Sequence, residues 1–175
     1  MIKKILKTKV LILAAGKGTR MQSELPKVLS VLKGKSMIKH VLDSVNQAIN
    51  VMPVAIVGYQ AELVKSELGS SVNYVFQSEQ LGTGHAVSCA RSVCEDFSNI
   101  LILTGDQPLI SSKTIKDLID KHANTRAKVT FATTTVSDFE DWRKGFVRFG
   151  RILRDNTKIL GIKEYNDSDK IIKNI

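Results

Sequence analysis

Short continuous apolar runs alternate along the chain with segments in which apolar residues recur at helical spacing. The runs are rich in Val, Ile and Leu and predict buried strands at residues 10–14, 54–57, 72–76, 100–103 and 129–134. The helical spacing predicts helices at residues 37–49, 61–68, 83–93 and 111–123. Buried strands separated by helices indicate an α/β fold, in which a Rossmann-like, mostly parallel sheet forms the middle of three layers.

The pattern changes after Ser137. Residues 145–153 alternate between apolar and polar side chains, which predicts an antiparallel strand or a hairpin. Residues 159–163 predict another short strand, and the apolar run 171–175 resembles the start of one more. Because no linker or repeat interrupts the chain, we expect residues 1–175 to form a single domain.

The first predicted strand leads directly into a glycine-rich turn, Gly16-Lys17-Gly18, which is followed by Arg20 and Lys27. Glycine lets the backbone approach a ligand closely, so that successive N–H groups can point at phosphate oxygens. The turn lacks the third glycine of the dinucleotide-binding fingerprint, and its spacing is not that of a Walker A loop. A plain strand-to-helix turn with solvated charges is the alternative, but three cations around one turn favour a polyphosphate site.

Two more polar segments follow predicted strands, at the sheet edge where α/β proteins bind ligands. Gly105-Asp106 places a carboxylate there, which suits Mg²⁺ beside a phosphate; an Asx turn before Pro108 is the alternative. The glutamines of residues 77–86 can read a nucleobase edge with a paired donor and acceptor. A polar loop with a helix cap at Thr83 is the alternative for that segment.

The three histidines show no metal-ligand spacing. We expect His40 and His122, which fall in predicted helices, to be structural. His85 lies next to the predicted base site. We find no serine or cysteine arranged as a nucleophile.

Composition narrows the class of protein. The 175 residues are 43% hydrophobic and 25% charged, with a formal net charge of +9. The basic residues are dispersed and are not interleaved with aromatic ones, so we expect no nucleic-acid surface; the positive field either gathers anionic substrates or only aids solubility. Cys89 and Cys94 fit neither a disulfide framework nor a metal site, which predicts buried free thiols in a reducing compartment. With no apolar run near membrane-spanning length and no signal peptide, we expect a cytoplasmic protein without a membrane partner.

Several of these segments together resemble one family. Residues 11–21 with 25–29 are similar to the signature of sugar-1-phosphate nucleotidyltransferases, and residues 77–86, 105–109 and 150–152 narrow the resemblance. They look like the N-terminal domain of the bifunctional N-acetylglucosamine-1-phosphate uridylyltransferase/glucosamine-1-phosphate acetyltransferase. The resemblance covers residues 9–175 and implies the nucleotide-diphospho-sugar transferase fold.

The resemblance also implies an activity. It is the transfer of a uridylyl group from UTP to N-acetylglucosamine-1-phosphate, giving UDP-N-acetylglucosamine and pyrophosphate for peptidoglycan and lipopolysaccharide synthesis. Arg20 and Lys27 would be catalytic, on the triphosphate, Asp106 would bind Mg²⁺, and Gly150 and Glu164 would bind the sugar. The implied nucleotide-binding residues are Leu13, Ala14, Ala15, Gly16, Gly18, Lys27, Gln77, Gly82 and Thr83.

The sequence departs from the family after Ile175, where the family's domain continues. A second Mg²⁺ ligand, the last strands of the domain and the β-helix acetyltransferase domain are not in this sequence. We therefore expect an incomplete domain, completed by a separately encoded C-terminal fragment or by a homo-oligomer. The alternatives are a non-catalytic remnant that at most binds uridine nucleotide, and a nucleotidyltransferase for another sugar phosphate.

Overall fold

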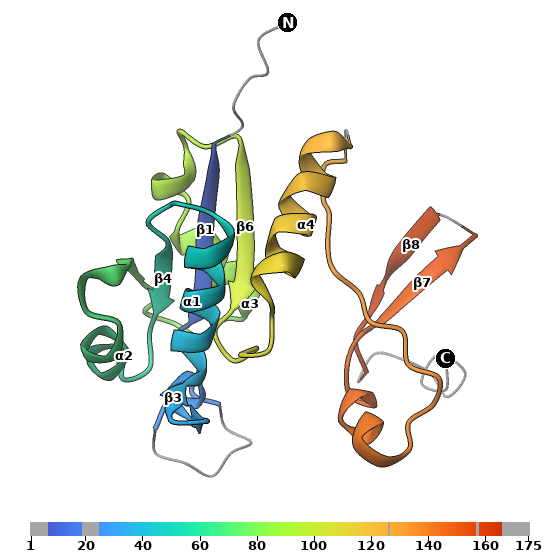
Figure 1. Ribbon diagram of the computed structural model, residues 1–175, viewed down its shortest axis with the longest axis horizontal. Coiled ribbons are helices and arrows are strands. Elements are labelled where there is room, and N and C mark those ends of the chain that lie inside the picture. Colours follow the sequence, from blue (N-terminus) through green and yellow to red (C-terminus); the bar gives the residue numbers. More distant parts are fainter. Residues whose placement is uncertain (1–6, 19–24, 126, 157, 166–175) are drawn as a thin grey trace, which may run out of the picture. The chain divides into compact units, whose positions relative to one another are not determined.

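The computed structural model describes residues 7–18, 25–125, 127–156 and 158–165. The chain divides into two compact units, residues 1–131 and 132–175, which we call unit 1 and unit 2 (Figure 1). Each unit is described by itself.

A four-stranded parallel sheet forms the centre of unit 1. Its strands are ordered β5-β4-β1-β6, with bounds β1 Thr8–Ala14, β4 Val54–Val57, β5 Asn73–Phe76 and β6 Asn99–Thr104. The first strand of the chain lies between two neighbours, so its Val10, Leu11 and Ile12 are completely buried. This arrangement confirms the predicted parallel sheet and four of its five predicted strands.

Helices cover both faces of this sheet (Figure 1). On one face, α1 (Met37–Ala48), α2 (Ala61–Leu68) and α4 (Ser112–Asn124) pack against the sheet around the fully buried Ile38, Val64 and Ile115. On the other face, α3 (Thr83–Cys89) and the 3₁₀ turn Ser92–Cys94 bury Ala86, Ala90 and Cys94 against β1 and β4. Ser111 caps α4, since its hydroxyl accepts a hydrogen bond from the Thr114 N–H at 3.0 Å.

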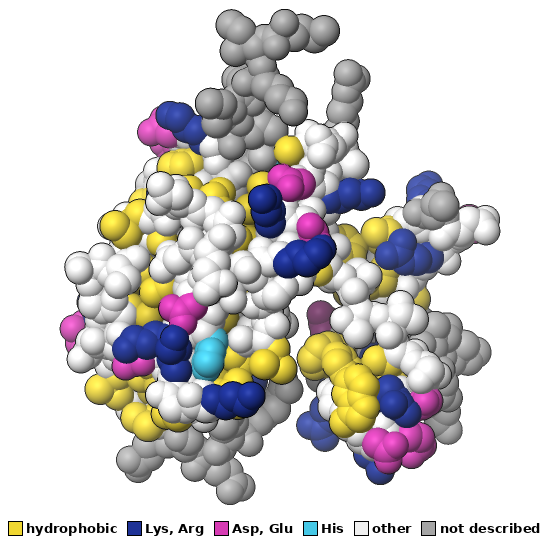
Figure 2. Space-filling view, in the orientation of Figure 1, with side chains coloured by type: hydrophobic (Ala, Val, Ile, Leu, Met, Phe, Trp, Pro, Cys, Tyr) yellow, Lys and Arg dark blue, Asp and Glu magenta, His cyan; other side chains and the backbone are white. Residues whose placement is uncertain are grey.

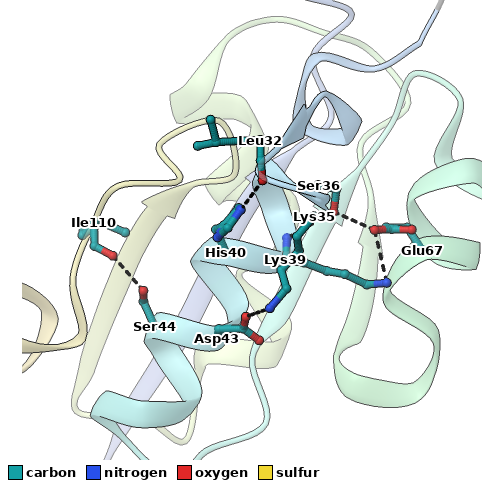
Figure 3. Close-up of polar contacts among 9 residues, drawn as sticks. All are labelled: Leu32, Lys35, Ser36, Lys39, His40, Asp43, Ser44, Glu67 and Ile110. Carbon is teal, nitrogen blue, oxygen red and sulfur yellow. Dashed lines mark hydrogen bonds and ion pairs between the residues drawn. The ribbon is translucent and has the colours of Figure 1, made fainter.

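A polar network fastens a small hairpin to the start of α1 (Figure 3). The hairpin pairs β2 (Val31–Leu32) with β3 (Lys35–Ser36). The Ser36 hydroxyl caps α1 and also donates to Glu67 Oε1 on α2 at 2.7 Å, while Lys39 contacts the same carboxylate at 3.2 Å. The hydrogen bond from Ser36 is the main reason that the pKa of Glu67 is lowered.

The same network includes the first histidine. His40 Nε2 lies 2.8 Å from the carbonyl oxygen of Leu32, so this side chain ties α1 to the hairpin (Figure 3). The Ser44 hydroxyl donates to the Ile110 carbonyl at 2.7 Å and fixes the loop before α4. These contacts are consistent with the structural role expected for His40.

Unit 2 is built differently. The 3₁₀ helix η5 (Asp141–Phe146) precedes an antiparallel hairpin of β7 (Arg151–Asp155) and β8 (Lys158–Lys163), with an irregularity in register at residues 153–154. The predicted hairpin is thus present, but residues 145–149 do not extend its first strand. Trp142, Phe146 and Phe149 instead make successive T-shaped ring contacts at helical spacing, which favours a helical turn there.

The predicted strand at residues 129–134 is wrong. The structure has no strand there, and the Val129 side chain is 73% exposed. Thr130 is held by its hydroxyl oxygen, which lies 2.8 Å from His122 Nδ1 near the end of α4. A β-prone sequence forms a strand only where another strand pairs with it, and none of the described strands does so here. Residues 171–175 lie outside the described residues.

Candidate functional site

The glycine turn after β1 is fixed at its base by backbone hydrogen bonds to two other loops. The Gly105 N–H donates to the Leu13 carbonyl at 2.9 Å, and the Tyr59 N–H donates to the Ala15 carbonyl at 3.0 Å. Gly16 follows with its backbone exposed and with open space where a Cβ would stand. Hydrogen bonds therefore fix the base of the turn, and the space beside Gly16 is open to a ligand.

Gly18 brings the next segment against this turn. Its φ is +68°, and a Cβ built on it would lie only 2.6 Å from the Cβ of Lys27. Any side chain at this position would push Lys27 away, and the left-handed backbone also disfavours one. Gly18 is therefore required for the close approach of the 3₁₀ helix η2 (Lys27–Leu29), which carries the lysine.

Lys27 meets the carboxylate that follows β6. Its Nζ donates to Asp106 Oδ2 at 2.8 Å, and each side chain is about one-third exposed (38% and 34%). The Asp106 carboxylate is thus engaged by a cation instead of capping its own turn. Because the pair remains accessible to water, it contributes little to stability and can exchange partners readily.

The loop after β5 contributes a buried amide. Gln77 is 3% exposed, and its backbone N–H donates to the Val57 carbonyl at 2.8 Å, which continues the pairing of β5 with β4. Its Nε2 lies 3.4 Å from the Gly82 carbonyl oxygen and 3.0 Å from His85 Nδ1. Gly82 has a φ of +101°, a value that a residue with a side chain rarely adopts.

These three segments line one cleft of about 390 Å³ at the carboxyl ends of the strands. Nine of the residues predicted for the nucleotide or the metal line it: Leu13, Ala14, Gly16, Gly18, Lys27, Gln77, Gly82, Thr83 and Asp106. Ala15 is buried beneath the turn and contributes its carbonyl to Tyr59. Arg20 lies outside the described residues.

The cleft has four more lining residues: Val28, Gln80, Ala86 and Thr104. Val28 and Ala86 are apolar and buried, so no sequence signal separated them from ordinary core residues. Thr104 could have been identified from the sequence, because it directly precedes Gly105-Asp106. Its Oγ1 is buried and has no hydrogen-bond partner among the described residues.

The two predicted sugar-binding residues are neighbours within unit 2. A Cβ built on Gly150 would lie 3.3 Å from Ile162 Cγ2 and 3.5 Å from Glu164 Oε1. The hairpin of β7 and β8 therefore brings the Glu164 carboxylate beside a position where only hydrogen now stands.

The donor set of the cleft suits a hard cation. Among the described residues, no group of three His, Cys, Asp or Glu side chains could hold a metal ion by itself. Asp106 supplies one carboxylate at the cleft, and Mg²⁺ typically takes one or two protein carboxylates together with phosphate oxygens and waters. The residues present therefore fit a cation that arrives with a phosphorylated ligand and do not fit a closed protein cage.

The charged side chains on the face drawn in Figure 2 are mixed in sign. Lys and Arg side chains are interspersed with Asp and Glu over the face seen in Figure 2. Over the described parts of the chain, no helix is both long enough and apolar enough to cross a membrane. Cys89 and Cys94 are both free thiols, as predicted, but only Cys94 is buried, and Cys89 is partly exposed. Burial raises the pKa of the Cys94 thiol.

The chain belongs to the nucleotidyltransferases, a class to which the glycine turn and the lysine–carboxylate pair at the carboxyl edge of the parallel sheet are suited. The sequence profile of the MobA-like NTP transferase domain matches residues 10–140, and the chain belongs to this family. The predicted membership of a nucleotidyltransferase family is thus confirmed.

Curated relatives agree with the family. The chain is 44% identical over 169 residues to the bifunctional protein GlmU of Exiguobacterium sibiricum, covering 94% of this chain and 36% of that protein. It is 39% identical over 171 residues to the bifunctional protein GlmU of Clostridioides difficile, covering 95% of this chain and 36% of that protein. The chain thus spans about a third of the length of these relatives.

Solved structures share the fold. HddC from Yersinia pseudotuberculosis, solved with GMP-PN, has a TM-score of 0.66 at 20% identity, covering 91% of this chain and 69% of that one. Rv0371c from Mycobacterium tuberculosis, solved with manganese, has a TM-score of 0.56 at 22% identity, covering 68% of this chain and 61% of that one. These likenesses confirm the predicted α/β architecture.

Proposed function

We propose that the chain is a uridylyltransferase that joins the uridylyl group of UTP to N-acetylglucosamine-1-phosphate and releases pyrophosphate. The observation that carries this proposal is the cleft of unit 1, which gathers the glycine turn, the Lys27–Asp106 pair and the Gln77 amide. The GlmU relatives support the choice of substrates. The product would serve the synthesis of cell-envelope polymers, peptidoglycan and lipopolysaccharide.

The two sides of the cleft suit the two ends of a nucleoside triphosphate. On one side, the exposed backbone at Gly16 and the ammonium group of Lys27 offer N–H donors and positive charge to phosphate oxygens. On the other side, Gln77 and the backbone at Gly82 and Thr83 offer the paired donor and acceptor that a pyrimidine edge requires. Arg20, by the family resemblance, would add a second cation to the triphosphate.

Asp106 is the residue that would hold Mg²⁺. When bound, the cation supplies charge neutralisation of the phosphates and helps to align them. Asp106 would then leave Lys27, whose ammonium group becomes free for a phosphate oxygen. The manganese complex of Rv0371c is an example of a divalent cation on this fold.

The chemistry needs little more from the protein. The phosphate oxygen of the sugar phosphate is already anionic at neutral pH, so it attacks the α-phosphorus of UTP without a protein base. Pyrophosphate leaves, and the new bond joins the phosphate of the sugar to the α-phosphate of the uridylyl group. The protein's part is to hold both reactants in line and to stabilise the developing negative charge through Lys27 and Arg20. Gly150 and Glu164, adjacent in unit 2, would hold the N-acetylglucosamine moiety.

Pyrophosphate release from UTP, N-acetylglucosamine-1-phosphate and Mg²⁺ tests the proposal on the chain as it exists. We expect release that Asp106→Ala abolishes. Measurement over a range of protein concentrations shows whether turnover needs a second copy, because the rate then rises more steeply than the concentration. UTP binding without release above the Asp106→Ala background would reject catalysis and reduce the site to a uridine-nucleotide binder. A faster rate with a different sugar phosphate would reject the proposed substrate.

Nucleotide binding gives an independent check on Asp106. In Mg²⁺-free buffer, Asp106→Asn should bind UTP at least as tightly as the wild type, because Lys27 is released from its carboxylate partner. With Mg²⁺ present, the wild type should gain affinity and Asp106→Asn should not. An equal gain in both proteins would place the cation elsewhere.

A further inference from the structure

His85 contacts the amide of Gln77 from the protein side of the cleft. Its Nδ1 lies 3.0 Å from Gln77 Nε2 and 2.9 Å from the carbonyl oxygen of Glu79. Its Nε2 lies 3.8 Å from Cys89 Sγ, one turn further along α3. Nδ1 thus faces one donor and one acceptor, of which it satisfies one in a given tautomer, and Gln77, which it touches, lines the cleft.

These contacts tie the amide's orientation to the ring. A carboxamide has a donor end and an acceptor end of nearly the same shape, and rotation by half a turn exchanges them. A ring nitrogen either donates or accepts, so for each state of Nδ1 only one end of the Gln77 amide complements it. With Nδ1 accepting from Nε2, the donor end of the amide is held by Nδ1 and by the Gly82 carbonyl, and rotation would place Oε1 against both acceptors in a side chain that is 3% exposed.

The orientation of the amide matters because uracil and cytosine differ by the same exchange. At position 3, uracil carries an N–H donor and cytosine an acceptor; at position 4, uracil carries a carbonyl acceptor and cytosine an amino donor. A glutamine fixed in one orientation complements one of these edges and opposes the other. A glutamine that rotates freely complements both.

We propose that His85 is a positioning residue that selects the pyrimidine, by fixing which end of the Gln77 amide faces the base. It acts through Gln77 and does not itself touch the nucleotide. This inference rests on the proposed function, since it assumes that Gln77 reads uracil. It adds a determinant of specificity behind the residues that line the cleft.

Substitutions at positions 85 and 89 separate this task from a merely structural one. His85→Leu fills similar space but offers Gln77 no hydrogen-bonding atom. Cys89→Ala loses the contact of Nε2 with Sγ but keeps the imidazole and serves as the matched control.

The measurement is the ratio of UTP to CTP affinity, from calorimetric titration of each folded variant with both nucleotides. We expect the wild type to bind UTP more tightly than CTP. His85→Leu should lower the ratio of UTP to CTP affinity about tenfold, mainly because CTP binds more tightly. Cys89→Ala should keep most of the preference. Because each ratio is taken within one protein, general loss of stability cancels.

The outcomes distinguish the two levels of the argument. A wild type without preference for UTP, or a Gln77→Leu variant with unchanged UTP affinity, would refute uracil recognition by this cleft. If both of these behave as expected but His85→Leu keeps the wild-type ratio, the assignment of His85 is overturned and the proposed function stands. A loss of preference in Cys89→Ala equal to that in His85→Leu would also overturn it, since the effect would then come from packing on α3 and not from Nδ1.

Discussion

Units 1 and 2 are stabilised in opposite ways. Unit 1 buries continuous apolar runs between helices, and three successive residues of β1 are completely inaccessible to solvent. In unit 2, Arg151 is the only buried side chain among residues 132–156 and 158–165, and Trp142 is 71% exposed. Unit 1 is therefore held by hydrophobic burial, and unit 2 by a hairpin, ring contacts and polar bonds.

Arg151 is central to the second kind of stability. Its guanidinium donates to the carbonyls of Phe149 at 2.5 Å and Val147 at 3.1 Å, and it lies 4.7 Å from the centre of the Phe139 ring. Nearby, Arg143 bonds Asp138, and this bond is the main reason that the pKa of Asp138 is lowered to about 2. The difference between the units teaches that the proposed nucleotide residues rest on a rigid core, while Gly150 and Glu164 depend on a few directional bonds.

The largest expected effect comes from removing Arg151. Arg151→Met deletes its bonds to the backbone and should lower the local free energy of opening in unit 2 by about 3 kcal/mol. Amide hydrogen exchange should show faster exchange in β7 and β8 with unchanged protection in β1. Arg148→Met, at an exposed position of the same unit, is the control and should change neither. Equal loss of protection in β1 would mean that the two units are not independent.

Lys27→Ala tests the cleft of unit 1. Loss of a charged contact to phosphate should weaken UTP binding by about 2 kcal/mol, roughly thirtyfold, without affecting exchange in unit 2. Titration calorimetry at fixed ionic strength measures it. Lys116→Ala, which removes the same charge from an exposed position on α4, is the matched control. Comparable weakening in both variants would trace the effect to net charge alone.

Ser36→Ala tests the polar fastening within the apolar unit. The change removes the cap of α1 and the hydrogen bond to Glu67, and we expect the free energy of unfolding to fall by about 1.5 kcal/mol. Denaturant unfolding followed by circular dichroism measures this loss. Ser66→Ala, at an exposed position on α2, should leave the midpoint nearly unchanged. A null effect of Ser36→Ala would show that burial alone holds the hairpin.

Glu67→Gln should have the smallest effect, and that effect should depend on pH. The folded-state pKa of Glu67 is lowered, so its carboxylate stabilises the fold above the ordinary pKa of a glutamate. This stabilisation is lost as the pH falls through the lowered value, because the carboxyl group is then protonated in both states. We expect Glu67→Gln to cost about 1 kcal/mol at neutral pH and nothing in acid, measured as unfolding curves over this range. A difference that persists in acid would contradict the assignment.

Much of unit 1 was predictable from the sequence because its cause is local. Continuous apolar runs such as residues 54–57 predict buried parallel strands wherever helices lie between them, and the α2 bounds were predicted to the residue. The cleft followed, because the carboxyl ends of parallel strands meet at one edge. That rule brought together the turn at Gly16 and Asp106, which are far apart in the chain.

What the sequence did not predict has both distant and local causes. Residues 129–134 have strand propensity but no strand to pair with, so they remain irregular. The hairpin of β2 and β3 was missed although Lys33 and Gly34 both have positive φ, the pattern of a tight two-residue turn. In unit 2, the spacing of Trp142, Phe146 and Phe149 is helical, and it outweighs the alternation that predicted a strand.

The central place of β1 in its sheet has a consequence for synthesis. β1 precedes both of its neighbours, which begin only at Val54 and Asn99. The apolar residues 10–12 therefore wait for a first partner until β4 is made and for a second until β6 is made, and such a delay is the condition in which nascent chains aggregate or engage chaperones. Lys27 and Asp106 are 79 positions apart, so the cleft has high contact order and is completed only at the end of this delay.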